Sequence, residues 1–262
     1  MTILRHNLVQ GAALVDAHLP RIGYKNLFRE GTVNASSQDD DYPKENAYDG
    51  LTYDAWRSTG AATEWVRTQV SSQNADYMAI AAHTLAGCDV KPQRSTDGSA
   101  WTDLESAYTV PDNRPIVWEW TSVADAYWRL LISNAAGPVS IGAIHVGLKT
   151  PMQKGLAVGW EPPELNEDVV YTNTMSHGGQ SLGRSIVRRG ARAQVSSEPV
   201  SFTWAREDWL SFVEVARRYA VFFWWSFLGK TEIVYGGIDD DKASFSKPQE
   251  VTTRFRISGI NR

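Results

Sequence analysis

Residues 65–83 read WVRTQVSSQNADYMAIAAH, and the two ends of this stretch carry different strand patterns. In WVRTQV (65–70), aromatic or polar residues alternate with valine and threonine, which is typical of a strand with one covered face. In YMAIAAH (77–83), apolar residues occupy both alternating sets, which is typical of a strand covered on both faces. One-sided and two-sided strands in one region predict sheets that are stacked face to face.

The strand pattern continues on the C-terminal side of this stretch. Further short β-like segments, separated by turn-forming residues, are IVWEW (116–120), YWRLLIS (127–133) and IGAIHVGL (141–148). Asp97-Gly98 stands among polar residues just before Trp101, and Asp-Gly readily adopts the positive φ angles of a tight hairpin turn. We therefore predict a β-sandwich from about Asn26 to Leu148.

The character of the chain changes after Thr150. Glycines and prolines punctuate residues 151–163, which places a domain boundary near 149–155. Beyond it, apolar residues at helical spacing predict one amphipathic helix over about 205–219. AVFFWWSFL (220–228) is about half as long as a bilayer-spanning helix and is predicted to be a buried strand, and TTRFRISGI (252–260) is predicted to be the final strand.

Composition and charge disfavour several classes of function. The chain has eleven Trp, ten Tyr and eight Phe, a content typical of β-sandwiches and of carbohydrate or protein contact surfaces. Its formal charge of -4 argues against a nucleic-acid partner. The single Cys88 cannot form an intrachain disulfide, and the five histidines show no metal-ligand spacing. We expect no enzyme activity, no signal peptide and no membrane insertion.

Five motifs occur in order in the first region. They are NASSQDDDYPKENAYDGLTYDAW (34–56), TEWVRTQV (63–70), QRSTDGSAWTDL (93–104), DAYWRLLIS (125–133) and VSIGAIHVG (139–147). This order resembles the coagulation factor 5/8 type C, or discoidin, family, and the resemblance covers nearly all of 26–148. It implies a jelly-roll β-sandwich whose loops at one end bind sugars, lipid head groups or proteins. The predicted fold class is mainly β: a discoidin-like jelly-roll β-sandwich plus a second β-rich domain with one α-helix.

Loop residues of the first domain are the candidates for ligand binding. Rings stack on sugar faces, and guanidinium, amide and imidazole groups supply directional hydrogen bonds. The candidates are Tyr42, Arg57, His83, Asn113, Arg114 and Asn134. The alternative for each of them is an ordinary solvated loop side chain, and a solvated charge run is the alternative for residues 39–41. Trp56 and Trp101 are predicted to be packing residues.

A calcium site is the one cofactor that the resemblance raises. Some discoidin-like members hold calcium near the Asp-Gly turn, and by position Asp49 and Asp54 match that site. Leu51 and Ala143 occupy positions where those members often have oxygen ligands. Because calcium takes six or more oxygens, we predict no cofactor and keep calcium as the open alternative.

The second region carries a resemblance of its own. PMQKGLAVGWEPP (151–163) followed by SHGGQSLGRSIVRRGA (176–191) resembles segments of tail-tip or baseplate proteins of long-tailed bacteriophages. This implies a tail-ring domain over 150–262 to which residues 1–24 return, so that the sandwich (25–149) is an insertion. Within that domain, a basic cluster either contacts acidic partners across a subunit interface or is a solvated face. The cluster includes Arg184, Arg188 and Arg189.

Together the resemblances predict a structural protein of a phage tail tip (a distal tail or baseplate protein) that is made in the host cytoplasm and located in the virion. Its expected partners are other tail proteins such as the tail tube and hub, a host cell-surface polysaccharide, and further copies in a homo-oligomeric ring, for example a hexamer. Ring symmetry would multiply weak sites. Two alternatives stay open: a bacterial glycan-binding adhesin or accessory module of a carbohydrate-active enzyme, and a purely architectural sandwich without a ligand.

Overall fold

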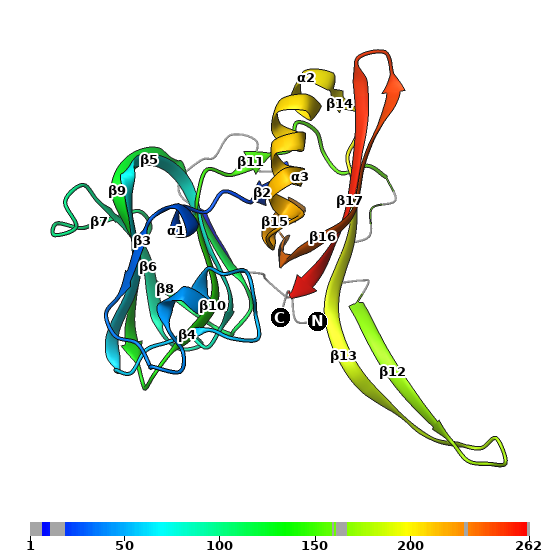
Figure 1. Ribbon diagram of the computed structural model, residues 1–262, viewed down its shortest axis with the longest axis horizontal. Coiled ribbons are helices and arrows are strands. Elements are labelled where there is room, and N and C mark those ends of the chain that lie inside the picture. Colours follow the sequence, from blue (N-terminus) through cyan, green and yellow to red (C-terminus); the bar gives the residue numbers. More distant parts are fainter. Residues whose placement is uncertain (1–6, 11–18, 159, 161–166, 228–229, 261–262) are drawn as a thin grey trace.

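The chain folds into two β-rich units that lie side by side (Figure 1). The structure is a computed structural model that describes residues 7–10, 19–158, 160, 167–227 and 230–260. Within these ranges, a nine-stranded sheet forms the sandwich and an eight-stranded sheet forms the second unit. The predicted mainly-β fold class, with one longer helix, is confirmed.

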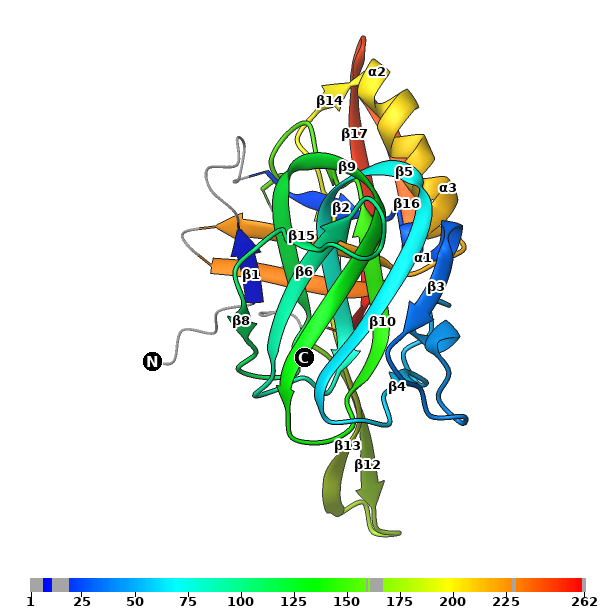
Figure 2. The ribbon, with the colours of Figure 1, turned by 90° about the vertical axis from the view of Figure 1, so that its left-hand side faces the viewer.

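The sandwich is built around two long strands. Its strands are β1 (Asn7–Gln10), β3 (Thr32–Ala35), β4 (Trp56–Arg57), β5 (Ala62–His83), β6 (Asp89–Ser95), β7 (Thr102–Asp103), β8 (Tyr108–Thr109), β9 (Ile116–Ala135) and β10 (Ser140–Gly147). A short helix α1 (Leu27–Glu30) and a 3-10 turn η1 (Lys44–Ala47) lie in the connections. Strands β5 and β9 pair along most of their length, and their register shifts between Gln69 and Tyr77, where both bend over (Figure 2).

The bends make two layers out of one sheet. The outer layer comprises β3, residues 62–70 of β5, residues 127–135 of β9, and β6. The inner layer comprises β4, β10, residues 77–83 of β5, residues 116–120 of β9, and β1. Between the layers lies a core with three fully buried tryptophans, Trp56, Trp118 and Trp128. Val66 of WVRTQV points into this core, whereas Trp65 lies on the outer surface, as the alternation predicted.

The second unit is a curved sheet with one helix packed on it. Its strands are β2 (Arg21–Gly23), β11 (Thr150–Pro151), β12 (Glu167–Met175), β13 (Ser181–Ser196), β14 (Val200–Ser201), β15 (Val221–Phe227), β16 (Lys230–Lys247) and β17 (Glu250–Ile260). The helix runs without interruption through α2 (Phe202–Trp204), the π-helical turn η2 (Ala205–Trp209) and α3 (Leu210–Ala216). The helix and the two strands expected over 220–228 and 252–260 are therefore present.

The segment before the sandwich contributes to both sheets. Strand β2 pairs with β15 and β11 of the second unit. Strand β1 instead runs parallel to β9 in the sandwich. Residues 1–6 and 11–18, which belong to the segment expected to return to the second unit, lie outside the described residues. The chain therefore leaves the sheet of the second unit after β2, forms the sandwich, and returns to the same sheet at β11.

The inner layer is covered on both faces, which explains the two-sided pattern of YMAIAAH. Met78 and Ile80 pack into the sandwich core, while Tyr77, Ala79 and Ala81 face the second unit. There they meet a second set of fully buried side chains from β15 and β16: Phe222, Trp224, Ile233 and Tyr235. Apolar burial on this scale, with tightly packed aromatic rings, holds the two units together.

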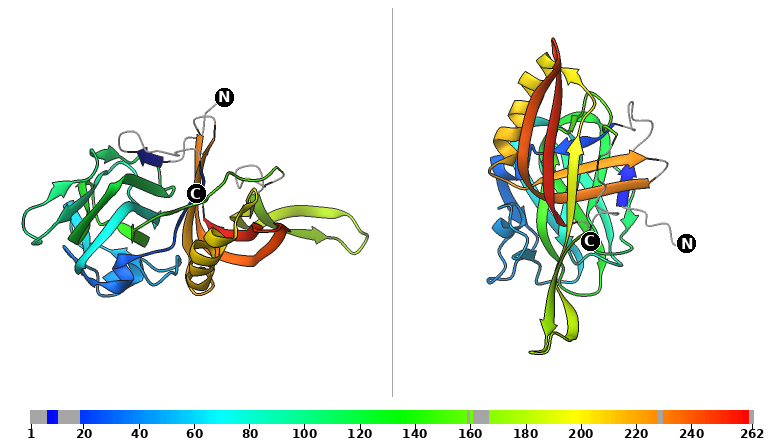
Figure 3. Two further views of the ribbon diagram at one scale, coloured as in Figure 1. Left: turned by 90° about the horizontal axis from the view of Figure 1, so that it is seen from above. Right: turned by 90° about the vertical axis from the view of Figure 1, so that its right-hand side faces the viewer.

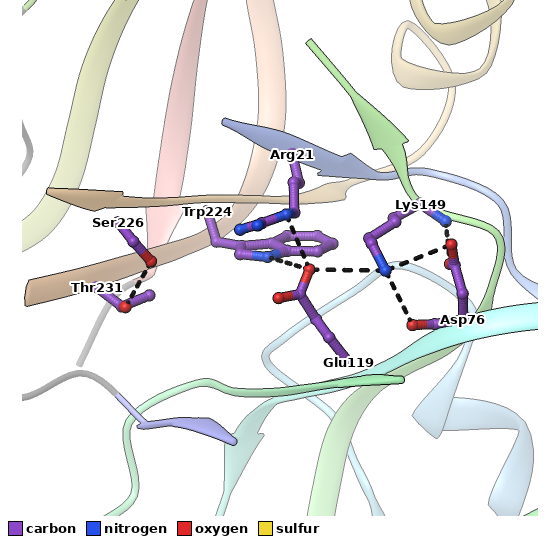
Figure 4. A network of polar contacts seen from close by, with 7 residues as sticks. All are labelled: Arg21, Asp76, Glu119, Lys149, Trp224, Ser226 and Thr231. Carbon is purple, nitrogen blue, oxygen red and sulfur yellow. Dashed lines mark hydrogen bonds and ion pairs between the residues drawn. The ribbon is translucent and has the colours of Figure 1, made fainter. Parts of the chain in front are cut away.

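A polar network crosses the same interface (Figure 4). Glu119 of β9 is fully buried, and its Oε1 lies 3.1 Å from Nε of Arg21 and 3.8 Å from Nζ of Lys149. Trp224 Nε1 also donates a hydrogen bond to this oxygen, at 3.2 Å. Lys149 extends the network to Asp76, whose carboxylate lies 3.4 Å away. The sandwich therefore supplies carboxylates to a cation on a strand of the second unit, Arg21, and to a cation on the connection to that unit, Lys149.

A two-stranded arm projects from the second unit (Figures 1 and 3). Strand β12 pairs only with β13 among the described residues, and β13 pairs with β17 only from Ala191 onward. Residues 176–180 form the turn at the tip of this hairpin, and β13 begins directly after them at Ser181. We call β12 and residues 176–190 the arm.

Candidate functional site

The structure brings the predicted ligand-binding residues to one end of the sandwich. Because β5 and β9 bend over, both ends of each strand lie at this end: Ala62 pairs with Ala135 there, and Ile80 with Ile116. The connections 36–44, 58–61, 84–88, 110–115 and 136–139 meet at it. We call this set of connections, with the residues that border them, the loop end. In Figure 1 it is the end where β4 and β8 lie.

Tyr42 and Arg57 form an exposed ring and cation pair at the loop end. The Arg57 guanidinium lies 5.8 Å from the centre of the Tyr42 ring, and Tyr42 is 41% exposed. The backbone holds the pair in place, because Arg57 N–H donates to Tyr42 O at 3.1 Å and Arg57 pairs with Ser140 of β10. This geometry offers an aromatic face and guanidinium donors side by side.

His83 lies at the loop end but is buried. Its Nε2 is 2.8 Å from Arg114 O, and Leu85 N–H donates to its Nδ1 at 3.3 Å. These partners assign the proton to Nε2. Burial lowers the pKa of His83 to about 4, since desolvation disfavours the imidazolium. With both ring nitrogens occupied, His83 joins two connections of the loop end and leaves no donor for a ligand.

The amide and guanidinium candidates are engaged with neighbouring loops. Asn113 Oδ1 accepts the Ala86 N–H at 3.0 Å, and the rest of this exposed side chain faces solvent. Arg114 Nε donates to Asp112 Oδ2 at 2.8 Å. Asn134 has a left-handed φ of 58° and donates to the Asp89 carboxylate. These contacts fix the shape of the loop end around the Tyr42 and Arg57 pair.

Glu64 organises the loop end and was missed by sequence reasoning. It is only 3% exposed, and the hydroxyls of Ser36 and Ser37 both donate to its carboxylate, the latter at 2.9 Å. The connection is anchored further by Trp56, whose Nε1 donates to Ser37 O at 3.0 Å. The adjacent serines of the NASS motif are the only sequence signal for this role, because their acidic partner lies 27 or 28 positions away.

Asp49 and Asp54 lie close enough to interact, but they supply few ligands for calcium. Asp49 Oδ1 accepts the Leu51 N–H at 2.8 Å, and Asp54 Oδ1 is buried without a hydrogen-bond partner. Burial, and then the charge of Asp54, raises the pKa of Asp49. No group of three or more His, Cys, Asp or Glu side chains that could hold a metal occurs among the described residues. Two carboxylates alone do not fit a calcium ion.

The basic cluster of the second unit lies on the arm. Arg184 stacks 4.6 Å from the centre of the Tyr171 ring, and its Nε donates to Asn173 Oδ1 at 2.9 Å. Arg189 is exposed, and the side chain of Arg188 lies outside the described part of the structure. Arg184, Arg188 and Arg189 therefore lie on the projecting arm.

Comparisons with known proteins find similarity only to solved structures. No family model matches the chain, and no curated protein matches it. A pectin-binding carbohydrate-binding module is 19% identical over 44% of this chain and 88% of its own, with a TM-score of 0.38. Chitosan-binding module 1 of a Paenibacillus sp. IK-5 chitosanase/glucanase is 22% identical over 46% and 97%, with a TM-score of 0.42. A Ruminococcus gnavus GH29 fucosidase is 19% identical over 48% of this chain and 27% of the fucosidase, with a TM-score of 0.42.

Helices of the described segments are all too short or too polar to cross a bilayer.

Proposed function

We propose that this chain acts by binding, with the loop end as a glycan-recognition surface and the second unit as an assembly domain of a phage tail tip. The observation that carries the recognition part is the exposed Tyr42 and Arg57 pair. An aromatic face next to a guanidinium suits a sugar, because the ring covers the apolar C–H face while the cation donates to hydroxyl groups. The exposed side chains of Asn113 and Asn134 lie at the same loop end.

The placement of the loop end supports recognition in an assembled particle. The second unit covers the face of the inner layer that points away from the sandwich core, and it contacts Tyr77, Ala79 and Ala81 there. The loop end lies at the tip of the sandwich, away from this covered face (Figure 1). An assembly built through the second unit therefore leaves the loops accessible.

The arm supports assembly, because it exposes apolar side chains on both faces. A two-stranded hairpin alone is at best marginally stable in water, so such a surface favours packing against a neighbour. The exposed apolar residues are Val170, Tyr171, Met175, Leu182, Ile186 and Val187, from 42% to 65% exposed. Exposed apolar positions on a projecting element are the feature expected of a subunit contact.

A groove at the opposite end of the second unit fits the arm of another copy. It has a volume of about 330 Å³ and lies between the helix and the β16–β17 hairpin. Phe202 and Phe245 stack at its edge with ring centres 5.6 Å apart, and both are exposed. The groove is lined mainly by apolar side chains, which suits the exposed apolar side chains of the arm. A contact between different surfaces of identical chains generates rings when it closes.

The tail-tip assignment rests on the resemblance of 151–163 and 176–191 to baseplate proteins. The proposal implies a location in the virion, with the tail tube and hub as neighbours and a host polysaccharide as the ligand. In a ring, several weak loop-end sites act together and raise the effective concentration of ligand. A monomer that binds glycans would instead favour the adhesin or enzyme-accessory alternative, and a ring that binds none would favour the architectural one.

Arg57→Ala and Tyr42→Ala are expected to weaken glycan binding by about tenfold or more each, because each removes a charge-assisted donor or a stacking face. A glycan array identifies the ligand, and calorimetric titration with that ligand measures the change. Lys247→Ala, which removes a 72% exposed cation from the second unit, is the matched control and should bind as the wild type does. Unchanged affinity in both loop-end variants would refute the assignment of the site.

Leu182→Asp and Phe245→Asp are each expected to convert an oligomer to monomers, because either places a charge in the same apolar contact. Light scattering coupled to gel filtration measures the mass, and electron microscopy shows whether the oligomer is a ring. Thr174→Asp, at an exposed polar position on the arm, is the control for charge alone. A wild-type chain that stays monomeric at all concentrations contradicts the assembly proposal.

A further inference from the structure

The outer surface of the outer layer presents two arginines directly opposite each other. Arg67 of β5 pairs in register with Arg129 of β9. The same cross-strand row continues to Asn34 of β3 on one side and to Gln93 of β6 on the other. Because neighbouring strands lie about 5 Å apart, the row places amide, guanidinium, guanidinium and amide groups side by side on one face.

Both guanidinium groups lie over aromatic rings. Arg129 lies 3.9 Å from the centre of the Trp101 ring, and Arg67 lies 4.9 Å from that of Trp65. Trp101, which the sequence predicts to be a packing residue, is thus half-buried at the surface as a support for Arg129. Tyr127 adds a second ring, 6.0 Å from Arg67. The two cations are therefore positioned by the fold and are not loose surface side chains.

The positive charge of the two arginines is offset only in part by the nearby Asp103. Arg67 donates to Gly98 O at 3.3 Å, and Arg129 Nε donates to Gln93 Oε1 at 2.7 Å. Neither arginine forms an ion pair with any carboxylate in the described ranges. The nearby Asp103 carboxylate forms an ion pair with Lys91, at 2.7 Å, and accepts a hydrogen bond from Gln93. Like charges directly opposite in a sheet destabilise it, so this arrangement is costly unless an anion binds to it.

We propose that Arg67 and Arg129 form a binding site for the carboxylate groups of an acidic polysaccharide. Two guanidinium forks side by side match the two oxygens of a carboxylate. The half-buried Trp65 and Trp101 rings offer apolar edges for a sugar ring, and the exposed amides of Asn34 and Gln69 offer hydrogen bonds to its hydroxyl groups. An extended polysaccharide chain fits the exposed face of a sheet.

The electrostatics of Arg129 agree with this assignment. Burial lowers the pKa of Arg129, and the charge of Arg67 lowers it further, with Asp103 acting in the opposite direction. An anion bound between the two arginines would relieve their repulsion. A dense polyanion such as a nucleic acid is disfavoured, because the chain as a whole carries a formal charge of -4.

This site is separate from the loop end. Arg67 lies five residues along β5 from Ala62, which corresponds to about 16 Å of strand. The inference goes beyond the proposed function, since it assigns a second surface with a different ligand chemistry. It stands whether or not Tyr42 and Arg57 bind a sugar.

The test uses the full chain and an oligogalacturonate, with its methyl-esterified form as the uncharged control. Titration calorimetry should detect binding of the acid form only, weakening as salt screens the charges. Arg67→Gln and Arg129→Gln are each expected to raise the dissociation constant about tenfold or more, and Arg129→Lys is expected to raise it less. Thermal melts of each variant establish that the chain remains folded.

Two variants separate this site from its surroundings. Arg94→Gln changes an arginine on β6 that is already paired with Asp125 at 2.7 Å, so it should leave oligogalacturonate binding unchanged. Arg57→Ala should also leave it unchanged, whereas it weakens binding of a loop-end glycan. No binding of the acid form at millimolar concentration overturns the proposal, as does equal binding by Arg67→Gln, Arg129→Gln and the wild type.

Discussion

A Glu119→Ala variant is expected to lose about 3–5 kcal/mol of its free energy of unfolding, because removing one member of a buried ion pair leaves the remaining charges uncompensated. Glu119 and Arg21 are at most 3% exposed, and the carboxylate also faces Lys149 and accepts from Trp224. The network lies between the two units, so its loss weakens the interface as well as the sandwich. Guanidinium unfolding followed by tryptophan fluorescence and far-UV circular dichroism measures the change.

Two further variants distinguish charge from packing in this network. Glu119→Gln keeps an acceptor for Trp224 and should cost less than Glu119→Ala. The double variant Arg21→Met with Glu119→Leu removes both charges and should recover much of the loss, because apolar residues often replace a buried pair at little cost. Separate fluorescence and dichroism midpoints would indicate that the units unfold independently. A Glu119→Ala loss below about 1 kcal/mol would contradict the role given to this carboxylate.

The local sequence pattern predicted the β architecture, because the spacing of apolar residues along a strand depends on whether one or both of its faces are buried. The one-sided alternation of 65–70 and the two-sided pattern of 77–83 correspond to the outer and inner layers of the same strand β5. The pattern cannot say what provides the second cover. Here it is the sheet of the second unit, through Phe222 and Trp224, which lie about 145 positions from Tyr77 in the sequence. A long-range partner of this kind leaves no local signal.

The boundaries of the helix were predicted less accurately than its presence. Spacing predicted it over 205–219, and the structure starts it at Phe202, because the Ser201 hydroxyl accepts the Trp204 N–H at 3.3 Å. It ends at Ala216, before the predicted end. The π-helical turn at Ala205–Trp209 changes the register of the apolar face. Such details follow from tertiary packing and not from residue spacing.

The candidate site was predictable in position but not in detail. Loop residues of a sandwich gather at its ends, so the sequence places Tyr42, Arg57 and Asn113 on the right kind of surface. It does not reveal that His83 is buried, because a strand end and a loop start look alike in sequence. The Arg67 and Arg129 pair depends on the register between two strands that are far apart in the sequence, and that register exists only in the fold.

The stability of the chain is expected to fall by about 3 kcal/mol between pH 6.5 and 4 through His83 alone. The folded-state pKa of His83 is about 4, against 6.5 for an unperturbed histidine. Below pH 6.5 the unfolded chain therefore takes up a proton that the folded chain excludes until about pH 4. Stability is fully present above this window and is lost as the pH falls through it. The cause is burial, which disfavours the imidazolium.

A second buried histidine acts in the same direction. His145 is fully buried at the interface between the units, its ring 5.0 Å from that of Phe222 and 5.6 Å from that of Tyr235. Burial, together with the charge of Arg29, lowers the pKa of His145 well below its ordinary value. Protonation of this ring therefore opposes the contact between the units. Acidification should weaken the interface as well as the loop end.

Unfolding free energies measured across the pH range test the assignment to His83. His83→Gln keeps a donor for Arg114 O but does not titrate. Between pH 6.5 and pH 4, its free energy of unfolding should therefore fall by about 3 kcal/mol less than that of the wild type. The titrating carboxylates are common to both chains and cancel in the difference. His177→Gln, at an exposed position on the arm, should follow the wild-type curve. If His83→Gln instead keeps the full wild-type slope, acid sensitivity arises elsewhere, and His145 is the first residue to substitute, because it too is buried away from water.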